Sequence, residues 1–114
     1  MICCLSALSY AKTNIPPYQA NVIQGERKYL NDAEIQYINA SIKRLRQKRN
    51  IYAAVYIVDH LNNESIEDLA HRAFNTWKLG TEKEDNGLLL LLAMEDRKMR
   101  LEVGYGLELS LIHI

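Results

Sequence analysis

The chain has 114 residues, of which 48% are hydrophobic, and its 14 basic and 14 acidic side chains give a formal net charge of zero. This length suffices for one domain and is too short for two, and a neutral chain gives no electrostatic reason to expect a nucleic-acid partner. The two cysteines, Cys3 and Cys4, are adjacent, so the sequence offers neither a disulfide framework nor a zinc–thiolate site.

The N-terminus has features of a secretory signal peptide. A short apolar run at residues 2–8 is followed by Ser9 and Ala11, small residues that suit the two subsites of signal peptidase. The run is too short to span a bilayer and no basic stretch precedes it, so an ordinary chain terminus is the alternative. We interpret residues 1–11 as the remnant of a signal peptide, and residues 12–21, which include two prolines, as an extended lead-in.

The first predicted element is an amphipathic helix at residues 31–49. Asn31 followed by Glu34 is a capping-box pair. The apolar side chains that recur on one face are Ile35, Ile38, Ile42 and Leu45. Cations crowd the last two turns, where they complement the helix dipole, and Asn50 can end the helix in a left-handed conformation.

A strand and a second helix follow. Residues 51–58 are uncharged and rich in β-branched and aromatic side chains, which predicts a strand covered on both faces. Residues 65–77 begin with a second capping-box pattern at Ser65 and continue with an apolar stripe. Phe74 and Trp77 belong to this stripe, so we expect them in the core rather than in a ligand site.

Two further strands complete the predicted fold. Residues 87–94 contain five consecutive leucines, which would also fit a helix, but Gly87 and the short length favour a strand. Residues 98–103 alternate between apolar and charged side chains, which predicts a half-buried strand that pairs back as a hairpin. A strand–helix–strand unit followed by a hairpin predicts an α/β fold in which 51–58 and 87–94 run parallel.

Several of these segments resemble the TPM domain family. The matching segments are residues 65–70 (SIEDLA), 74–80 (FNTWKLG), 85–87 (DNG), 96–98 (DRK), 100–103 (RLEV) and 104–108 (GYGLE). They follow the order and approximate spacing of the family, so residues 22–108 are identified as a TPM domain. The resemblance implies a three-layer α/β/α sandwich with a mixed, mostly parallel central sheet.

The sequence departs from the family pattern in two places. A glycine often follows the family's tryptophan closely, whereas Gly80 comes three residues after Trp77. Residues 109–114 stand where the family continues with a glycine and a further helix and strand. We interpret 109–114 as a non-native tail and the domain as incomplete at its C-terminus.

The resemblance also carries expectations about location and activity. Family members usually follow a signal peptide and precede a transmembrane helix, and have been described as acid phosphatases, calcium-binding modules and accessory proteins of photosystem repair or of receptors. The resemblance implies an exported, extracytoplasmic protein that is membrane-tethered at full length, with a membrane-protein or membrane-surface partner. The sequence contains no phosphate-binding loop, nucleophile elbow or dinucleotide motif, so we expect no organic cofactor.

The first candidate site is a metal site at one end of the predicted sheet. The hairpin should bring the end of strand 98–103 beside the start of strand 87–94, which groups Asp85, Asn86, Tyr105 and Glu108. Carboxylate, amide and carbonyl oxygens suit a hard cation, Ca²⁺ rather than Mg²⁺, and such a cation could orient a phosphate ester and activate water. Simple turn chemistry is the alternative explanation of the Asp-Asn-Gly segment.

The second candidate site lies at the opposite end, where the parallel strands finish. Asp59 leaves the same sheet edge as Glu95 and Asp96, and Arg97 could hold an anion there. Carboxyl ends of parallel strands are the usual binding side of open α/β sheets. The alternative is that Glu95-Asp96-Arg97 is only a hairpin turn.

Other polar groups carry weaker indications. His60 and His71 do not have metal-ligand spacing, and His113 lies in the predicted tail. The basic run at residues 43–49 is explained by the helix dipole, and contact with anionic lipid headgroups is the functional alternative.

The sequence therefore predicts an extracytoplasmic TPM accessory or interaction domain that binds a divalent cation without turnover. The alternative is a metal-dependent acid phosphatase, a phosphoric monoester hydrolase of low substrate specificity. The preference for binding rests on chemistry, because the sequence supplies no activated nucleophile.

Overall fold

The computed structural model describes residues 13–25 and 27–112, so the predicted signal-peptide remnant at residues 1–11 lies outside the described residues. The elements in chain order are β1 (Val22–Gln24), α2 (Asp32–Arg49), β2 (Tyr52–Val58), α3 (Ile66–Trp77), β3 (Gly87–Ala93), β4 (Lys98–Val103) and α4 (Tyr105–Ile112). The predicted helices and strands are all present, with ends that differ by no more than a residue or two.

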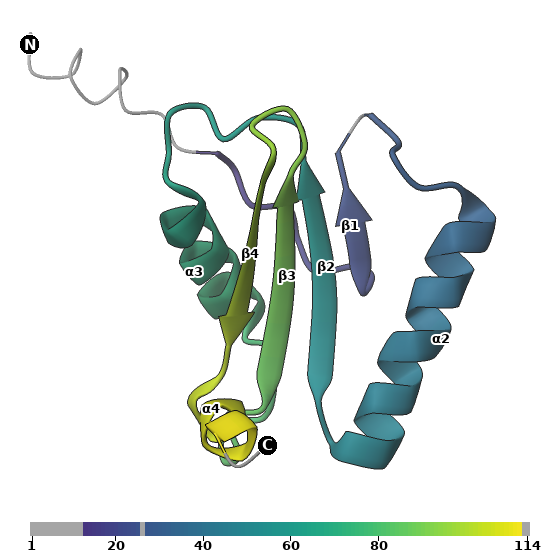
Figure 1. The fold of residues 1–114 in the computed structure, drawn as a ribbon, viewed down its shortest axis with the longest axis vertical. Coiled ribbons are helices and arrows are strands. Elements are labelled where there is room, and N and C mark those ends of the chain that lie inside the picture. Colours follow the sequence, from purple (N-terminus) through teal and green to yellow (C-terminus); the bar gives the residue numbers. More distant parts are fainter. Residues whose placement is uncertain (1–12, 26, 113–114) are drawn as a thin grey trace, which may run out of the picture.

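The strands form one four-stranded sheet in the order β1-β2-β3-β4 (Figure 1). β1, β2 and β3 are parallel, with Tyr52 opposite Gly87, whereas β4 is antiparallel to β3, with Leu90 opposite Leu101. The predicted parallel pair and hairpin are thus confirmed. The sequence analysis did not predict β1, because three residues are too few to show the alternation of a strand.

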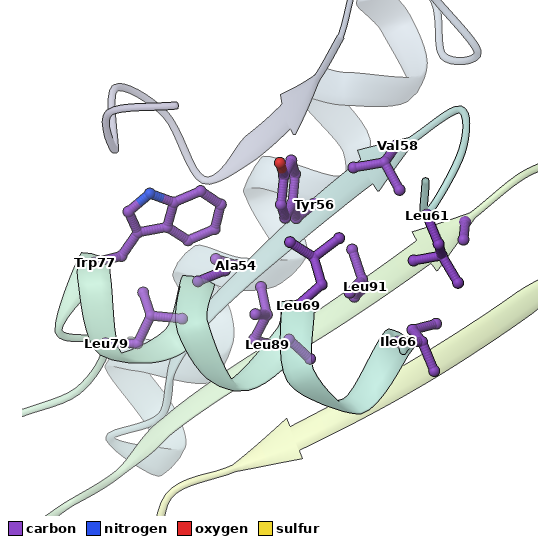
Figure 2. Packing of buried hydrophobic residues seen from close by; sticks show 13 residues of the cluster. Ala54, Tyr56, Val58, Leu61, Ile66, Leu69, Trp77, Leu79, Leu89 and Leu91 are labelled. Carbon is purple, nitrogen blue, oxygen red and sulfur yellow. The ribbon is translucent and has the colours of Figure 1, made fainter. Parts of the chain in front are cut away.

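The two long helices cover opposite faces of the sheet, which confirms the predicted three-layer α/β/α class. β3 shows how the layers arise, because successive side chains of a strand point to opposite faces. Leu89 and Leu91 are fully buried on the α3 side, whereas Leu88 packs on the α2 side. Figure 2 shows Leu89, Leu91 and Trp77 in the cluster beneath α3. Burying one such leucine stabilises the fold by about 1.5–3 kcal/mol.

The helix caps follow the sequence closely. Asn31 and Glu34 form the predicted capping box of α2, and Asn50 ends that helix with φ 57° and ψ 39°. Ser65 caps α3 by accepting from the backbone N–H of Asp68 at 3.0 Å, but within the described residues this is only half of the predicted capping box, because Asp68 does not return the second hydrogen bond. Lys78, and not Gly80, takes the left-handed position that ends α3.

Gly80 has a different role, which concerns packing. Its φ is 84°, and a Cβ at this position would collide with the backbone at the start of β3. The loop after α3 therefore approaches β3 closely, and this approach needs glycine.

β4 ends at Val103, where the predicted strand ends, and α4, a helix that the sequence analysis did not predict, begins at Tyr105. The backbone of α4 continues to Ile112, so part of the segment interpreted as a non-native tail is helical, and residues 113–114 lie outside the described residues.

Candidate functional site

The start of β3 and the start of α4 meet at one corner of the molecule. The backbone N–H of Gly104 donates to the Gly87 carbonyl at 2.8 Å, and that of Gly106 donates to the Asp85 carbonyl at 3.0 Å. A Cβ at Gly104 or Gly106 would collide with the carbonyl oxygen of Asp85 or Glu84, respectively. Glycines therefore allow the two backbone segments to approach as closely as the predicted metal site requires.

Three of the four predicted metal ligands lie at this corner. Asp85 has a left-handed backbone, with φ 52°, and its Oδ2 accepts from the backbone N–H of Tyr105 at 3.2 Å. Asp85 thereby caps α4. Tyr105 and Glu108 are three residues apart on α4, so they share one face of its first turn. Both side chains are exposed.

Asn86, the fourth predicted ligand, is buried, and its amide is used inside the protein. Its Oδ1 accepts from the backbone N–H of Thr81 at 2.7 Å. Its Nδ2 donates to the Asn50 carbonyl at 2.5 Å, with Glu84 as a longer second partner at 3.4 Å. Asn86 thus ties the loop before β3 to the end of α2, which leaves its amide oxygen little freedom to bind a cation.

The corner is acidic. Four exposed carboxylates lie in its two segments, at Glu82, Glu84, Asp85 and Glu108, and one exposed cation, Lys83, lies among them. Within the part of the chain that the structure describes, none of these four takes part in an ion pair. Residues 13–25 and 27–112 also contain no group of three His, Cys, Asp or Glu side chains arranged to hold a metal ion. Any cation here would depend on one or two carboxylates completed by carbonyl oxygens and water.

The second candidate site lies at the other end of the sheet. The Asp59 carbonyl accepts from the backbone N–H of Glu95 at 3.0 Å, and Asp96 Oδ2 accepts from the backbone N–H of Leu61 at 2.8 Å. The predicted juxtaposition of the ends of β2 and β3 therefore exists. Arg97 is exposed and takes the left-handed position of the hairpin turn, with φ 54°.

The loop after β1 contributes groups that sequence reasoning missed. Tyr29 donates its hydroxyl to Asp59 Oδ1 at 2.7 Å, and this hydrogen bond raises the pKa of Tyr29. Arg27 lies over the Tyr29 ring, 5.4 Å from its centre, and approaches Glu95 Oε2 at 3.5 Å. The Nε2 atom of His60 lies 3.4 Å from the same carboxylate oxygen. The positions of Arg27 and Tyr29 follow only from β1, which the sequence did not reveal.

A cleft of about 500 Å³ opens beside these groups. Gln24 and Gly25 from the end of β1 line it together with Asp59 and His60 from the end of β2. The chain passes from β1 to α2 on one face of the sheet and from β2 to α3 on the other. Neighbouring strands whose connections leave in opposite directions form the crevice at which open α/β sheets bind ligands.

A second cleft, of about 310 Å³, lies between α2 and β2. Lys43 and Arg46 line it together with Tyr18, and Arg46 lies over the Tyr52 ring at 5.4 Å from its centre. Asn39 also lines it, and the buried Oδ1 of Asn39 has no hydrogen-bond partner among the described residues. The cleft therefore combines the cations of Lys43 and Arg46 with an unpaired polar atom, the Oδ1 of Asn39.

These features define a small α/β/α domain with an acidic corner at one end of the sheet and a polar cleft at the other. The family model of the TPM domain matches residues 23–111, so the chain belongs to the TPM domain family. This confirms the resemblance drawn from the sequence motifs.

Two solved structures are similar to the chain. The solution structure of the N-terminal domain of a P. gingivalis protein has 32% sequence identity and a TM-score of 0.68, over 76% of this chain and 55% of that one. The N-terminal domain of a protein from Corynebacterium glutamicum has 19% identity and a TM-score of 0.64, over 86% and 64%, and shows the fold alone. The chain spans less than two thirds of the length of either structure.

No match was found among curated proteins. Among the described residues, no helix is both long enough and apolar enough to cross a bilayer.

Proposed function

We propose that this TPM domain is a binding module that takes a divalent cation, Ca²⁺ in preference to Mg²⁺, at the acidic corner formed by β3 and α4. The observation that carries the proposal is the concentration of exposed carboxylates there without ion pairs among the described residues. Like charges on one surface repel, and a cation bound among them relieves that repulsion. Asp85 and Glu108 supply carboxylates, Tyr105 supplies an oxygen, and Asn86 positions the loop.

Ca²⁺ fits this corner better than Mg²⁺ on physical grounds. Ca²⁺ accepts six to eight oxygens in a flexible geometry and tolerates several waters and carbonyl oxygens, whereas Mg²⁺ demands a near-ideal octahedron. One or two exposed carboxylates on a loop and a helix form a flexible ligand set. We expect a weak site with a measurable preference for Ca²⁺.

The second candidate function is a metal-dependent phosphoric monoester hydrolase, and the cleft at the ends of β1 and β2 favours it. This cleft offers room for a substrate beside a carboxylate at Asp59 and an imidazole at His60. Asp96 and Arg97 lie in the adjoining hairpin turn. Because the cleft and the acidic corner occupy opposite ends of the sheet, single substitutions can test the two functions separately.

The test uses the full chain with Asp85→Asn, Asp59→Asn and, as a matched control, Glu67→Gln on the exposed first turn of α3. Calorimetric titration with CaCl₂ and MgCl₂ should show Ca²⁺ binding that falls about tenfold or more in Asp85→Asn, which corresponds to about 1.4 kcal/mol. The other two variants should bind as the unchanged chain does. Wild-type affinity in Asp85→Asn would contradict the binding proposal.

The same proteins should be assayed with p-nitrophenyl phosphate in the presence of each metal. Under the binding proposal, hydrolysis stays at the buffer rate for every protein. Hydrolysis above that rate that is lost in Asp59→Asn would establish the enzyme instead.

We further propose that the protein is exported, tethered to a membrane at full length, and meets an anionic membrane surface or a membrane protein through the basic half of α2. The exposed cations there are Lys43, Arg44, Arg46, Lys48 and Arg49. A basic residue near an anionic bilayer contributes about 1 kcal/mol. Sedimentation with phosphatidylglycerol vesicles should remove the chain from solution at low salt, and the double variant Lys48→Glu/Arg49→Glu should stay behind. Equal sedimentation of both proteins would contradict this contact.

A further inference from the structure

The cleft between α2 and β2 exists because β1 is short. β1 pairs with Val55–Ile57 and stops short of Tyr52 and Ala53 at the start of β2. The segment that leads into β1 and the basic half of α2 border the remaining space, which has a volume of about 310 Å³ and a size that suits a small ligand. Figure 1 shows α2 on the β1 side of the sheet, away from β4. The cleft is built entirely from residues 18–53.

One face of α2 brings three polar side chains to this cleft. Asn39, Lys43 and Arg46 all line it, and their spacings of four and three residues place them one above the other on the helix. Within residues 13–25 and 27–112, neither cation takes part in an ion pair. None of the described residues that line the cleft is acidic. The cleft therefore presents two uncompensated positive charges, which attract an anion.

The guanidinium of Arg46 is held in a defined position. It lies over the Tyr52 ring, 5.4 Å from the ring centre, and such a contact orients the planar group. Tyr18 lies close to the same guanidinium: burial raises the pKa of Tyr18, and the positive charge of Arg46 opposes that rise. An oriented guanidinium binds a phosphate group through two parallel N–H donors.

The buried Oδ1 of Asn39 adds a second requirement for the ligand. It accepts no hydrogen bond from the described residues. The Tyr18 hydroxyl, which also lines the cleft, donates to Asn21 Oδ1 at 2.7 Å and so is not the missing donor. A buried acceptor without a partner is costly, so a ligand that brings a hydroxyl group gains free energy by donating to it. A carboxylate or a sulfate ion has no such group.

We propose that this cleft binds a phosphate ester that carries a neighbouring hydroxyl group, as phosphoglycerol does. Lys43 and Arg46 bind the phosphate, and the hydroxyl group donates to Asn39 Oδ1. The same chemistry has two sources, the headgroup of an anionic lipid and a soluble ester. The lipid source rests on the proposed membrane contact of α2 and makes that contact specific, whereas the soluble source is independent of it.

The soluble arm of the test is an NMR titration of the full chain with glycerol 3-phosphate and with methyl phosphate, which lacks the hydroxyl group. Both esters should shift the backbone N–H signals of Tyr52 and Ala53. Glycerol 3-phosphate should bind about threefold more tightly, because it makes one more hydrogen bond. Arg46→Gln should weaken both esters about tenfold. Arg49→Gln removes an exposed cation of α2 outside the cleft and should bind both as the unchanged chain does.

Asn39→Leu separates the hydroxyl contact from the phosphate contact. Leucine has a similar size but no acceptor, so this variant should bind the two esters equally. It should also unfold at the same urea concentration as the unchanged chain or a higher one, because Oδ1 has no hydrogen bond to lose within the described residues.

The lipid arm compares vesicles of phosphatidylglycerol with vesicles of phosphatidylmethanol, which carry the same charge without the hydroxyl groups. If the ligand is a lipid headgroup, the chain sediments preferentially with phosphatidylglycerol, and Asn39→Leu loses that preference. If glycerol 3-phosphate binds in solution and the chain shows no preference between the lipids, the ligand is a soluble ester.

Two results would overturn the site. The first is an absence of shifts at Tyr52 and Ala53 with glycerol 3-phosphate up to about 20 mM, a range that covers millimolar dissociation constants. The second is equal binding of the two esters by the unchanged chain, in solution and on vesicles. Sedimentation with neither lipid contradicts the membrane contact instead, and the soluble titration then decides the site alone.

Discussion

Replacing the buried Asn86 by aspartate separates a structural role from a metal-binding role at the acidic corner. Asn86 is 4% exposed, and its Nδ2 donates to the Asn50 carbonyl at 2.5 Å. Aspartate has the same shape but has an acceptor where asparagine has a donor. The Asn50 carbonyl therefore loses its hydrogen-bond partner, and the new carboxylate faces Glu84, which lies 3.4 Å from Nδ2. The unpaired carbonyl lowers the free energy of unfolding by about 1–3 kcal/mol, and the buried, unpaired carboxylate raises the total loss to about 3–5 kcal/mol.

Urea denaturation followed by tryptophan fluorescence measures this loss in the free energy of unfolding. Asn63→Asp makes the same chemical change at an exposed position of the loop before α3 and should alter stability by less than about 0.5 kcal/mol. Calcium titration supplies the second readout, because an added carboxylate at a true ligand position would tighten binding. An Asn86→Asp protein that is as stable as the unchanged chain and binds Ca²⁺ more tightly would refute the structural role.

Two further predictions concern the interior and the alkaline limit of stability. Arg72→Ala should lower the free energy of unfolding by about 2–4 kcal/mol in urea melts, because Glu64 loses its ion-pair partner. The Glu64 side chain is only 6% exposed, and its carboxylate lies 2.7 Å from Arg72. A loss below about 0.5 kcal/mol would contradict this. Burial raises the pKa of Tyr56 above its usual 10.0, so the folded state holds the phenolic proton more tightly than the unfolded state. The contribution of the Tyr56 phenol to stability is therefore complete below pH 10 and is lost as the pH rises through the pKa of Tyr56 in the folded state. The Tyr56→Phe protein should consequently lose less stability than the unchanged chain between about pH 9 and 11.5. Parallel pH curves for the two proteins would count against that cause.

The elements predicted well are those whose causes lie within a few residues of one another. The Asn31–Glu34 capping box and the left-handed Asn50 depend on local hydrogen bonds, and the structure reproduces both. Residues 98–103 form the predicted strand, but the predicted half-burial is wrong, because the apolar side chains of Met99 and Leu101 are exposed along with the charged ones. The parallel order of β2 and β3 also follows, because a strand–helix–strand unit has few ways to bury its apolar faces. That order is what brought Asp59 beside the turn at Glu95.

The features that the sequence left open depend on segments far apart in the chain. β1 is recognisable as a strand only because it pairs with β2 some 33 positions later, Val22 opposite Val55. That pairing is what places Tyr29 against Asp59.

At the acidic corner, the motif determined that Asp85, Asn86 and Tyr105 would meet, because a hairpin has to return there. Only the packed structure decided the direction of each side chain: Asn86 inward to Thr81 and Asn50, and Asp85 onto the first N–H of α4. The physical reason is that a buried amide must satisfy both its donor and its acceptor, and the partners that can do so are known only once the distant segments have been brought together.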